Sequence, residues 1–201
     1  MKFLSRSLYS ECMEKGHCYL VKSDGDCYLG RILKLSDETY VIDAVYAYEV
    51  QGEKIAGFGD CELKFSETTA IKEVPADVSD KLYNGYKDAY DTVMRLKPKE
   101  HLQPYKFEIG CCHLSDYTSL QVVNFSRITD MRNNIVYLHT LFVEGTNLSY
   151  VNEEMDLDEL KDWEVTRMDP NVFGKIERII KFQYSAIDAT MRAYLEQIEY
   201  Y

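Results

Sequence analysis

The sequence predicts an α+β protein, mostly β, built from two small β-barrel units in tandem, each followed by a helix. One observation behind this prediction is an internal repeat at an offset of 94 residues, in which Gly-His-Cys at 16–18 recurs as Gly-Cys-Cys at 110–112. Near the other end of the unit, residues 74–78 correspond to residues 168–172 at the same offset. The second observation is that each repeat reads as short β-type segments followed by an amphipathic helix. An offset that persists across a unit indicates duplication.

Length and composition set the domain organisation and the compartment. The 201 residues suffice for two small domains, which we place at residues 1–99 and 100–201. Apolar residues make up 46% of the chain, which favours a folded core over disorder. The first residues are not followed by a long apolar run, and no stretch approaches the roughly 18 apolar residues of a membrane span. We therefore expect a cytoplasmic protein that does not contact a membrane.

The six cysteines are irregularly spaced and form no CxxC pair. The adjacent Cys111 and Cys112 are poorly placed to bridge each other. This usage is typical of a reducing compartment, so we expect six free thiols that mostly fill small spaces in the core.

The net charge of −11 is uneven. It divides into −3 for residues 1–99, which hold 14 basic and 17 acidic residues, and −8 for residues 100–201, which hold 9 and 17. Such a surface repels phosphate backbones, which disfavours nucleic acid as a partner. The acidic segment 153–164 is interpreted as a solvated face, or else as a nucleic-acid mimic or the docking surface of a basic partner. Its candidate partner-binding residues are Glu153, Glu154, Asp156, Asp158, Glu159 and Trp163.

The first unit is predicted to contain five strands and a helix. The Asp-Gly turn within 23–26 is typical of a β-hairpin, and Gly30 inside the second strand indicates a bend. Glycines at 52, 57 and 59 indicate a loop before the fourth strand. An apolar stripe with helical spacing predicts a helix over 78–96, capped by Asp77 or Ser79. The predicted strands are residues 17–22, 27–35, 39–48, 61–65 and 68–74.

The second unit is predicted to follow the same order. Its strands are expected at residues 107–113, 119–128 and 135–143, with one or two short strands within 155–167. A one-residue gap is expected in the second strand, where residues 36–37 match 129–130 at offset 93. Asp169 as N-cap and Pro170 in the first turn begin a helix of about 30 residues. The apolar stripes of the two helices are expected to pack on each other or on a second chain.

The segment 19–37 contains a strand, a tight Asp-Gly turn, Gly30 and a bent strand that ends near Asp37. It resembles the first motif of the Sm-like family, which includes bacterial RNA chaperones of the Hfq type, and residues 62–71 resemble that family's closing β-segment. SH3-like barrels share this pattern. The resemblance implies a small β-barrel and assembly through edge strands.

The resemblance does not extend to the family's RNA site. Basic residues occupy the family's closing motif, whereas this chain has Phe65-Ser66 there, and the loop after Asp37 begins with Glu38. The second unit lacks the glycine at the bend and carries Val123-Asn124 instead. The resemblance therefore implies the fold and not the RNA-binding residues.

Histidines and cysteines are the candidates for a site of chemistry. Histidine and cysteine at 17–18 and 111–113 suggest a zinc site or a thiol nucleophile. Because neighbouring residues of a strand point to opposite faces, few of these side chains can converge, and we expect no metal and no cofactor. His139, in an apolar strand, is interpreted as a core or rim histidine.

Four tyrosines of the first unit form the candidate ligand site. Tyr28, Tyr40, Tyr46 and Tyr48 could line a groove for a base, a peptide or a methylated side chain. The alternative is that they are ordinary half-buried strand residues.

No recognisable catalytic motif accompanies these residues, so we expect a non-enzymatic interaction or assembly module. Its partner would be a protein, or a second copy that binds through an edge strand or the C-terminal helix. One alternative function is the binding of a nucleotide or single-stranded RNA in the tyrosine-lined groove. Another is an acidic decoy that inhibits a nucleic-acid-binding partner.

Overall fold

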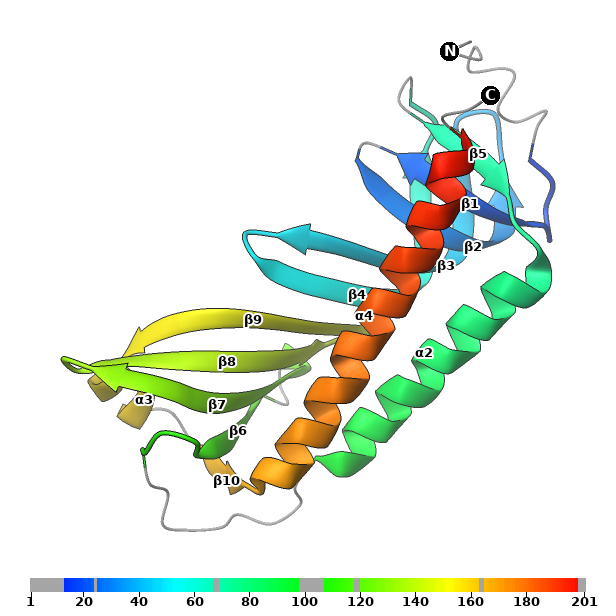
Figure 1. Cartoon of the computed structure of the whole chain (residues 1–201). Coiled ribbons are helices and arrows are strands. Elements are labelled where there is room, and N and C mark those ends of the chain that lie inside the picture. Colours follow the sequence, from blue (N-terminus) through cyan, green and yellow to red (C-terminus); the bar gives the residue numbers. More distant parts are fainter. Residues whose placement is uncertain are drawn as a thin grey trace. The chain divides into compact units, whose positions relative to one another are not determined.

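The computed structural model describes residues 13–23, 25–66, 69–97, 107–117, 120–162 and 165–198 (Figure 1). The class is α+β and mostly β, with one open antiparallel sheet of ten strands in the order β10-β6-β7-β8-β9-β4-β3-β2-β1-β5. Among the described residues, no helix is both long enough and apolar enough to cross a membrane.

The two repeats have the same strand order. The first repeat runs β4-β3-β2-β1-β5 and the second runs β9-β8-β7-β6-β10, so the internal repeat read from the sequence reappears as a repeated topology. The strands of the first repeat are β1 (Cys18–Ser23), β2 (Asp26–Leu35), β3 (Thr39–Val50), β4 (Glu53–Lys64) and β5 (Ala70–Glu73). Those of the second are β6 (Cys112–Tyr117), β7 (Val122–Arg132), β8 (Ile135–Glu144), β9 (Asn147–Asp156) and β10 (Thr166–Met168).

Backbone hydrogen bonds fix which residues correspond. The amide of Gly16 donates to the carbonyl of Ile32 at 2.8 Å, and the amide of Gly110 donates to the carbonyl of Ile128 at the same distance. Each of these isoleucines is followed by a β-bulge. The offset between equivalent residues is therefore 94 where β1 is compared with β6. It is 96 where β2 is compared with β7 and β3 with β8. It returns to 94 where α2 (Ala76–Leu96) and α4 (Pro170–Ile198) begin.

The expected one-residue gap at offset 93 is wrong, because the second repeat instead has two extra residues in the hairpin between β6 and β7. The two-residue insertion also changes which residue of the second repeat is equivalent to Gly30. Gly30 lies opposite Ala44, and Ser126 lies opposite Thr140, so Ser126 rather than Val123-Asn124 occupies the glycine position.

Gly30 is required by a close approach between strands. A Cβ atom at this position would lie 2.0 Å from the carbonyl oxygen of Asp43 and 2.5 Å from the Cα of Ala44. Only glycine fits such an approach without movement of the backbone. The equivalent Ser126 has room for its side chain, so the two repeats differ in local strand spacing.

The structure does not show two closed barrels. In the first repeat the outer strand β4 lies between β3 and β9 in the sheet order, so its free edge is occupied by β9 and not by β5. The repeats consequently remain open, and the ends of the sheet are the short strands β5 and β10. Short edge strands limit unwanted pairing with other chains.

Two local predictions were also wrong. The glycine-rich stretch expected as a loop is strand, because Gln51 and Gly52 have φ values of 50° and 84° and form a tight turn between two long strands. In the second repeat, β9 extends back to Asn147, and the helix α3 (Leu157–Asp162) occupies part of the segment expected as strand. The carboxylate of Asp156 accepts a hydrogen bond from the amide of Asp158 at 2.8 Å, which caps this helix.

The described chain divides into two compact units that do not coincide with the halves of the sequence. Unit 1 contains residues 13–48, 56–88 and 183–198, and unit 2 contains residues 49–55 and 89–182. Each unit thus combines the strands of one repeat with the beginning of its own helix and the end of the other. The apolar stripes of both helices are buried within this chain, as at Val93 and Ile187, which are both 0% exposed.

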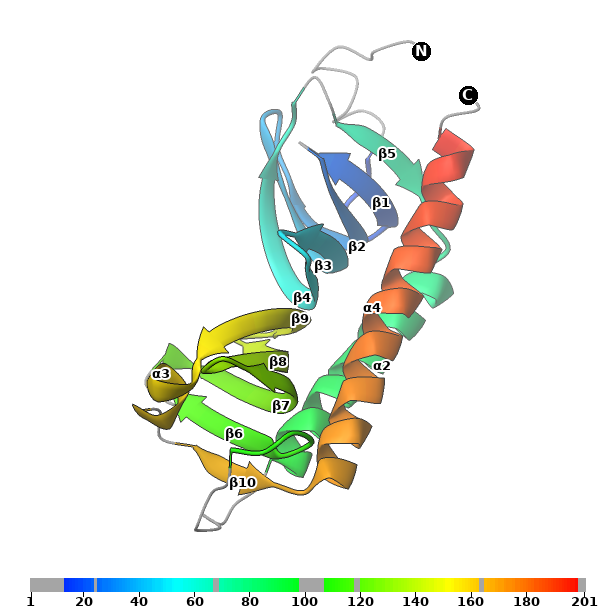
Figure 2. The ribbon, with the colours of Figure 1, turned by 60° about the vertical axis from the view of Figure 1, so that its left-hand side comes forward.

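Each unit has its own hydrophobic core under a curved set of strands (Figure 2). The core of unit 1 includes Tyr40 and Phe65. One core cluster of unit 2 includes Leu138 and Leu160, and Phe125 and Leu141 of the same unit are also 0% exposed. Polar side chains take part of the corresponding space in unit 2.

Candidate functional site

A polar cluster between the strands and the first half of the following helix occurs in both units. In each, an arginine on the second strand lies opposite a titratable residue on the third strand. The helix that follows supplies two further polar residues at the offset of 94. The equivalent pairs are Arg31 and Arg127, Asp43 and His139, Tyr83 and Glu177, and Lys87 and Lys181.

In unit 1 Arg31 is paired, and Asp43 has a hydrogen bond from Tyr83, although the Oδ1 atom of Asp43 has no hydrogen-bond partner among the described residues. The guanidinium of Arg31 donates to Asp80 at 2.9 Å and to the carbonyl of Gly16 at 2.8 Å. Burial raises the pKa of Asp43, against the lowering effect of a hydrogen bond from the Tyr83 hydroxyl. Burial, together with that bond to Asp43, raises the pKa of Tyr83 to about 12. The tyrosine therefore stays neutral and acts as a donor.

In unit 2 a histidine replaces the aspartate. The Nδ1 atom of His139 lies 2.8 Å from Oδ1 of Asn152, so Nδ1 carries the proton that is donated to this amide oxygen. Its Nε2 atom lies 3.2 Å from Oε1 of Glu177, but the geometry does not make a hydrogen bond. Glu177 also accepts a hydrogen bond from Lys181 at 2.6 Å and lies 3.7 Å from the guanidinium of Arg127.

Aromatic rings hold the two cations of this cluster. The Cζ atom of Arg127 lies 4.3 Å from the centroid of the Phe173 ring, and Nζ of Lys181 lies 5.4 Å from that of Tyr150. Both distances are within the range of cation–π attraction. The rings fix the positions of the charged groups while leaving them partly exposed, at 32% for Arg127 and 42% for Lys181.

The electrostatics keep Glu177 ionised. Partial burial opposes its ionisation, but the hydrogen bond from Lys181 and the charges of Lys181, His139 and Arg127 outweigh this effect. The net result lowers the pKa of Glu177 below its ordinary value. The carboxylate therefore serves as a fixed negative charge that orients the surrounding cations.

These side chains line a surface depression of about 360 Å³ in unit 2. Its lining contains three cations, Lys54, Arg127 and Lys181, and one carboxylate, Glu177, while Lys54 also lies 4.0 Å from Glu49 outside the lining. In the equivalent cluster of unit 1, Asp43 and Asp60 offset the basic residues. The full lining is Gly52, Lys54, Arg127, Thr129, His139, Tyr150, Val151, Asn152, Glu177 and Lys181.

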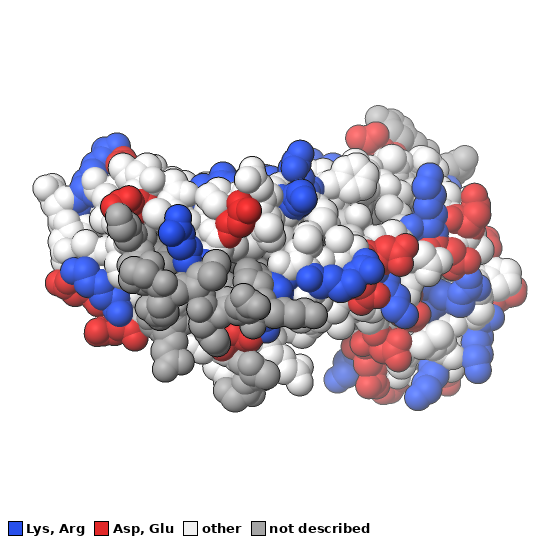
Figure 3. Space-filling model, turned by 90° about the horizontal axis from the view of Figure 1, so that it is seen from below, with Lys and Arg blue, Asp and Glu red and all other residues white. Residues whose placement is uncertain are grey.

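The excess of positive charge in the depression contrasts with the protein as a whole, which carries −11. Figure 3 shows a face on which acidic and basic side chains are interspersed, without a broad basic patch. A local group of cations held on aromatic faces is suited to a small anionic group, such as a carboxylate or phosphate.

The candidate tyrosine groove is only partly assembled. Tyr46 lies between Tyr28 and Tyr48, with ring centroids 6.0 Å and 6.3 Å away. Tyr40 is not in this row, because it is 1% exposed and packs on Phe65 in the core at 4.8 Å. Burial raises the pKa of Tyr28 to about 12, so its hydroxyl stays neutral.

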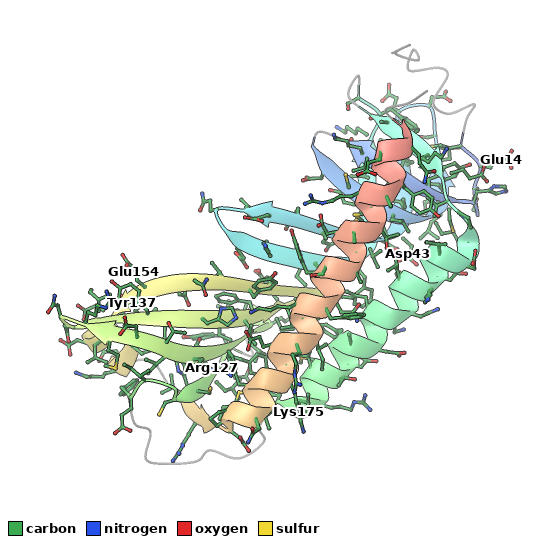
Figure 4. The ribbon with its side chains drawn as sticks, in the orientation of Figure 1. Glu14, Asp43, Arg127, Tyr137, Glu154 and Lys175 are labelled. Atoms are coloured by element: carbon green, nitrogen blue, oxygen red, sulfur yellow. The ribbon has the colours of Figure 1, made fainter. Side chains whose placement is uncertain are left out.

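The acidic residues of the second repeat do not share one surface. The carboxylate of Glu153 accepts a hydrogen bond from the buried Thr140 at 2.5 Å, whereas Glu154 points away on the outer side of β9 (Figure 4). Asp156 and Asp158 both accept hydrogen bonds from the side-chain amide nitrogen, Nδ2, of Asn134. Glu159 is exposed on α3, and Trp163 lies outside the described residues.

The histidines and cysteines that were candidates for a metal site have separate environments. Within the described ranges, no three His, Cys, Asp or Glu side chains are grouped so as to hold a metal ion. His17 contacts Glu73 at 3.0 Å, and His113 is 0% exposed, where burial lowers its pKa to about 4. The five described cysteines are free thiols, and Cys12 lies outside the described residues.

Sequence reasoning missed Arg127, Glu177, Lys181 and the role of His139 in this cluster. The signal was present in the repeat. An offset of 96 in the second and third strands aligns Arg127 with Arg31 and His139 with Asp43. The offset of 94 in the helices aligns Glu177 with Tyr83 and Lys181 with Lys87. The offset of 93 that was expected after the second strand instead aligned Asp43 with Val136 and concealed the pattern.

Comparison of the chain with models of protein families, with curated proteins and with solved structures finds no match.

Proposed function

We propose that this protein is a non-enzymatic interaction module made of two related Sm-like or SH3-like units, and that unit 2 binds an anionic group of a partner protein in the depression around Glu177. The observation that carries the proposal is the placement of Lys54, Arg127 and Lys181 around one carboxylate in a strongly acidic chain. An anion that enters the depression meets more positive than negative charge.

The cluster has the features of a binding site more than those of a catalytic one. A general acid or base works best with a pKa near the ambient pH, whereas the lowered pKa of Glu177 keeps it ionised. Both ring nitrogens of His139 face protein groups, Asn152 and Glu177. The hydroxyl of Thr129, in the same lining, donates to the carbonyl of Tyr137 at 3.0 Å and is not directed by a base.

A nucleotide is the second candidate ligand, and Tyr150 favours it. Its ring lies in the same lining as the cations, so a base could stack there while phosphates meet Arg127 and Lys181. The row of Tyr28, Tyr46 and Tyr48 in unit 1 is a weaker candidate, because after burial the next largest effect on Tyr28 is the negative charge of Asp26, which disfavours an anion there. The acidic-decoy function has less support, because the carboxylates of 153–159 are divided between different faces.

Assembly through sheet edges would use β5 or β10, since β9 occupies the edge of β4. Light scattering on the purified protein, with its absorbance ratio at 260 and 280 nm, tests both assembly and bound nucleic acid. A monomer free of nucleic acid fits a module that binds a protein partner. A large oligomer with nucleic-acid absorbance would instead favour the RNA function.

The binding proposal is tested with two labelled probes, a glutamate-rich peptide and a nucleoside triphosphate, by fluorescence anisotropy. We expect R127Q and K181Q each to weaken binding about tenfold, as for loss of one charge-assisted contact. The matched control is K87Q, at the equivalent position of unit 1, which should bind like the original protein. Equal effects of K181Q and K87Q, or no binding of either probe, would overturn the assignment of the depression, and turnover lost in H139Q would overturn the non-enzymatic function.

A further inference from the structure

The inner face of the unit 2 sheet, on the side of Ser126 and not of Arg127, is polar where unit 1 is apolar. Ser115 and Asn124 lie directly opposite each other on β6 and β7. The equivalent pair in unit 1 is Val21 and Tyr28, on β1 and β2. Because the two repeats share strand order and register here, the difference lies in side chains and not in topology.

The polar face continues across the next two strands. Ser126 and Thr140 are opposite each other, 0% and 1% exposed, with their hydroxyl oxygens 3.0 Å apart. The Thr140 hydroxyl donates to Glu153 at 2.5 Å. Unit 1 has Ala44 at the position of Thr140. A continuous patch of hydroxyl, amide and carboxylate groups thus extends from β6 to β9.

Two groups of this patch have unmet hydrogen-bonding capacity. Ser115 is 1% exposed and Asn124 is 7% exposed. Neither the hydroxyl oxygen of Ser115 nor the Oδ1 atom of Asn124 has a hydrogen-bond partner among the described residues. A buried polar atom without a partner is costly, and native proteins tolerate it where a water, an ion or a ligand takes the contact. The apolar set of unit 1 shows that the fold does not require these groups.

The groups of this patch that lack a hydrogen-bond partner or are half-buried are mainly hydrogen-bond acceptors. Asn124 presents its amide oxygen, and Glu153 is a half-buried carboxylate. A second half-buried carboxylate, Glu53, accepts a hydrogen bond from Ser149 at 2.5 Å. No ion pair joins Glu53 or Glu153 to a cation in the described part of the chain. An acceptor-rich site with two carboxylates favours a cation that carries several N–H donors.

We propose that the inner face of unit 2 binds a guanidinium group, with Glu153 and Asn124 as acceptors and the Ser115 hydroxyl as a further partner. The group is an arginine side chain or a free alkylguanidine. This site is independent of the proposed function, because it lies on the other side of the β7–β8 pair from Arg127 and His139 and prefers the opposite charge.

The test measures binding of two probes by calorimetry and by chemical-shift perturbation: agmatine, and an acetylated, amidated Gly-Arg-Gly peptide. A peptide with citrulline in place of arginine keeps the shape and removes the charge. We expect E153Q to weaken binding about tenfold, since it removes one charge-assisted contact while its amide oxygen still accepts the Thr140 bond. S115A removes the unpaired hydroxyl and should also weaken binding.

The matched control is E154Q, one residue along β9 and on the other face, which should bind both probes as the original protein does (Figure 4). Tighter binding of agmatine than of the peptide identifies a free guanidine as the ligand, and the reverse identifies an arginine side chain. No binding of either probe, binding that E153Q and E154Q weaken equally, or equal binding of the citrulline peptide would overturn the proposal and leave only buried water in the patch. The depression around Glu177 is tested separately, by binding of the glutamate-rich probe to R127Q. Either proposal can therefore be overturned without affecting the other.

Discussion

Asp43 and His139 occupy the same position in two copies of one fold, and each lies directly opposite an arginine on the neighbouring strand. Asp43 accepts a hydrogen bond from Tyr83 on α2, whereas His139 lies 3.2 Å from Glu177 on α4. Between the repeats, the acid on the strand is replaced by a histidine, and the tyrosine on the helix is replaced by an acid. Such paired change indicates that contact between strand and helix was retained while the chemistry of the cluster diverged.

The fixed charge of Glu177 leads to a prediction about stability. E177Q should lower the free energy of unfolding by about 1–2 kcal/mol, because Lys181 and Arg127 lose the charge that they share. Since the folded state holds the pKa of Glu177 below the ordinary 4.5, its contribution is present above pH 4.5 and is lost as the pH falls below it. Urea titration at pH 7 and pH 4 measures both effects. E62Q, an exposed change on β4, is the control, and an equal loss in both variants would contradict the prediction.

Buried His113 predicts a second acid transition, at higher pH. Burial lowers its pKa from 6.5 to about 4, so the folded state excludes a proton that the unfolded chain binds. The stabilising effect of its neutral form is complete above pH 6.5 and is lost as the pH falls toward 4, by about 3 kcal/mol in all. H113Q should flatten this dependence between pH 6.5 and 4.5, whereas H17Q, at an exposed histidine, should keep it. A steep dependence that survives in H113Q would assign the transition to other groups.

The repeat itself was predictable from sequence, since the offset of 94 between the Gly-x-Cys segments and between the helix starts reappears in the structure. Closure of each repeat was predicted wrongly, because local strand patterns do not show which edge pairs with which. The pairing of β9 on β4 depends on the long β3–β4 hairpin, whose turn at Gln51-Gly52 was hidden among other glycines.

The candidate site was harder to predict than the fold. Arg127, His139 and Glu177 come from two strands and a helix and form no local motif, so only a repeat alignment with the correct two-residue insertion brings them together. The tyrosine prediction was limited by depth along the strand. Strand periodicity places Tyr40, Tyr46 and Tyr48 on one face of β3. Only the structure shows that Tyr40 packs on Phe65 in the core, whereas Tyr48 is 37% exposed near the end of the strand.

Gly30 provides a sharp test of the register between β2 and β3. G30A places a methyl group 2.0 Å from a carbonyl oxygen of the neighbouring strand, so the backbone must move. We expect a loss of about 3 kcal/mol or more in unfolding free energy. G85A in α2 is the matched control, because a Cβ there meets nothing within 4 Å and alanine favours the helix by about 0.5–1 kcal/mol. Similar stability of G30A and the original protein would show that the register is wrong.

The polar inner face of unit 2 predicts that binding and stability oppose each other at Ser115. S115V inserts the residue that unit 1 has at Val21 and removes a buried hydroxyl without a partner among the described residues. It should raise the unfolding free energy by about 1 kcal/mol, because the cost of the unpaired group disappears. The reciprocal change V21S buries a hydroxyl in an apolar core and should cost about 2 kcal/mol. Thermal and urea unfolding of both variants measure this. If S115V were instead destabilised as much as V21S, Ser115 would have a structural partner, and the case for a ligand at this position would be lost.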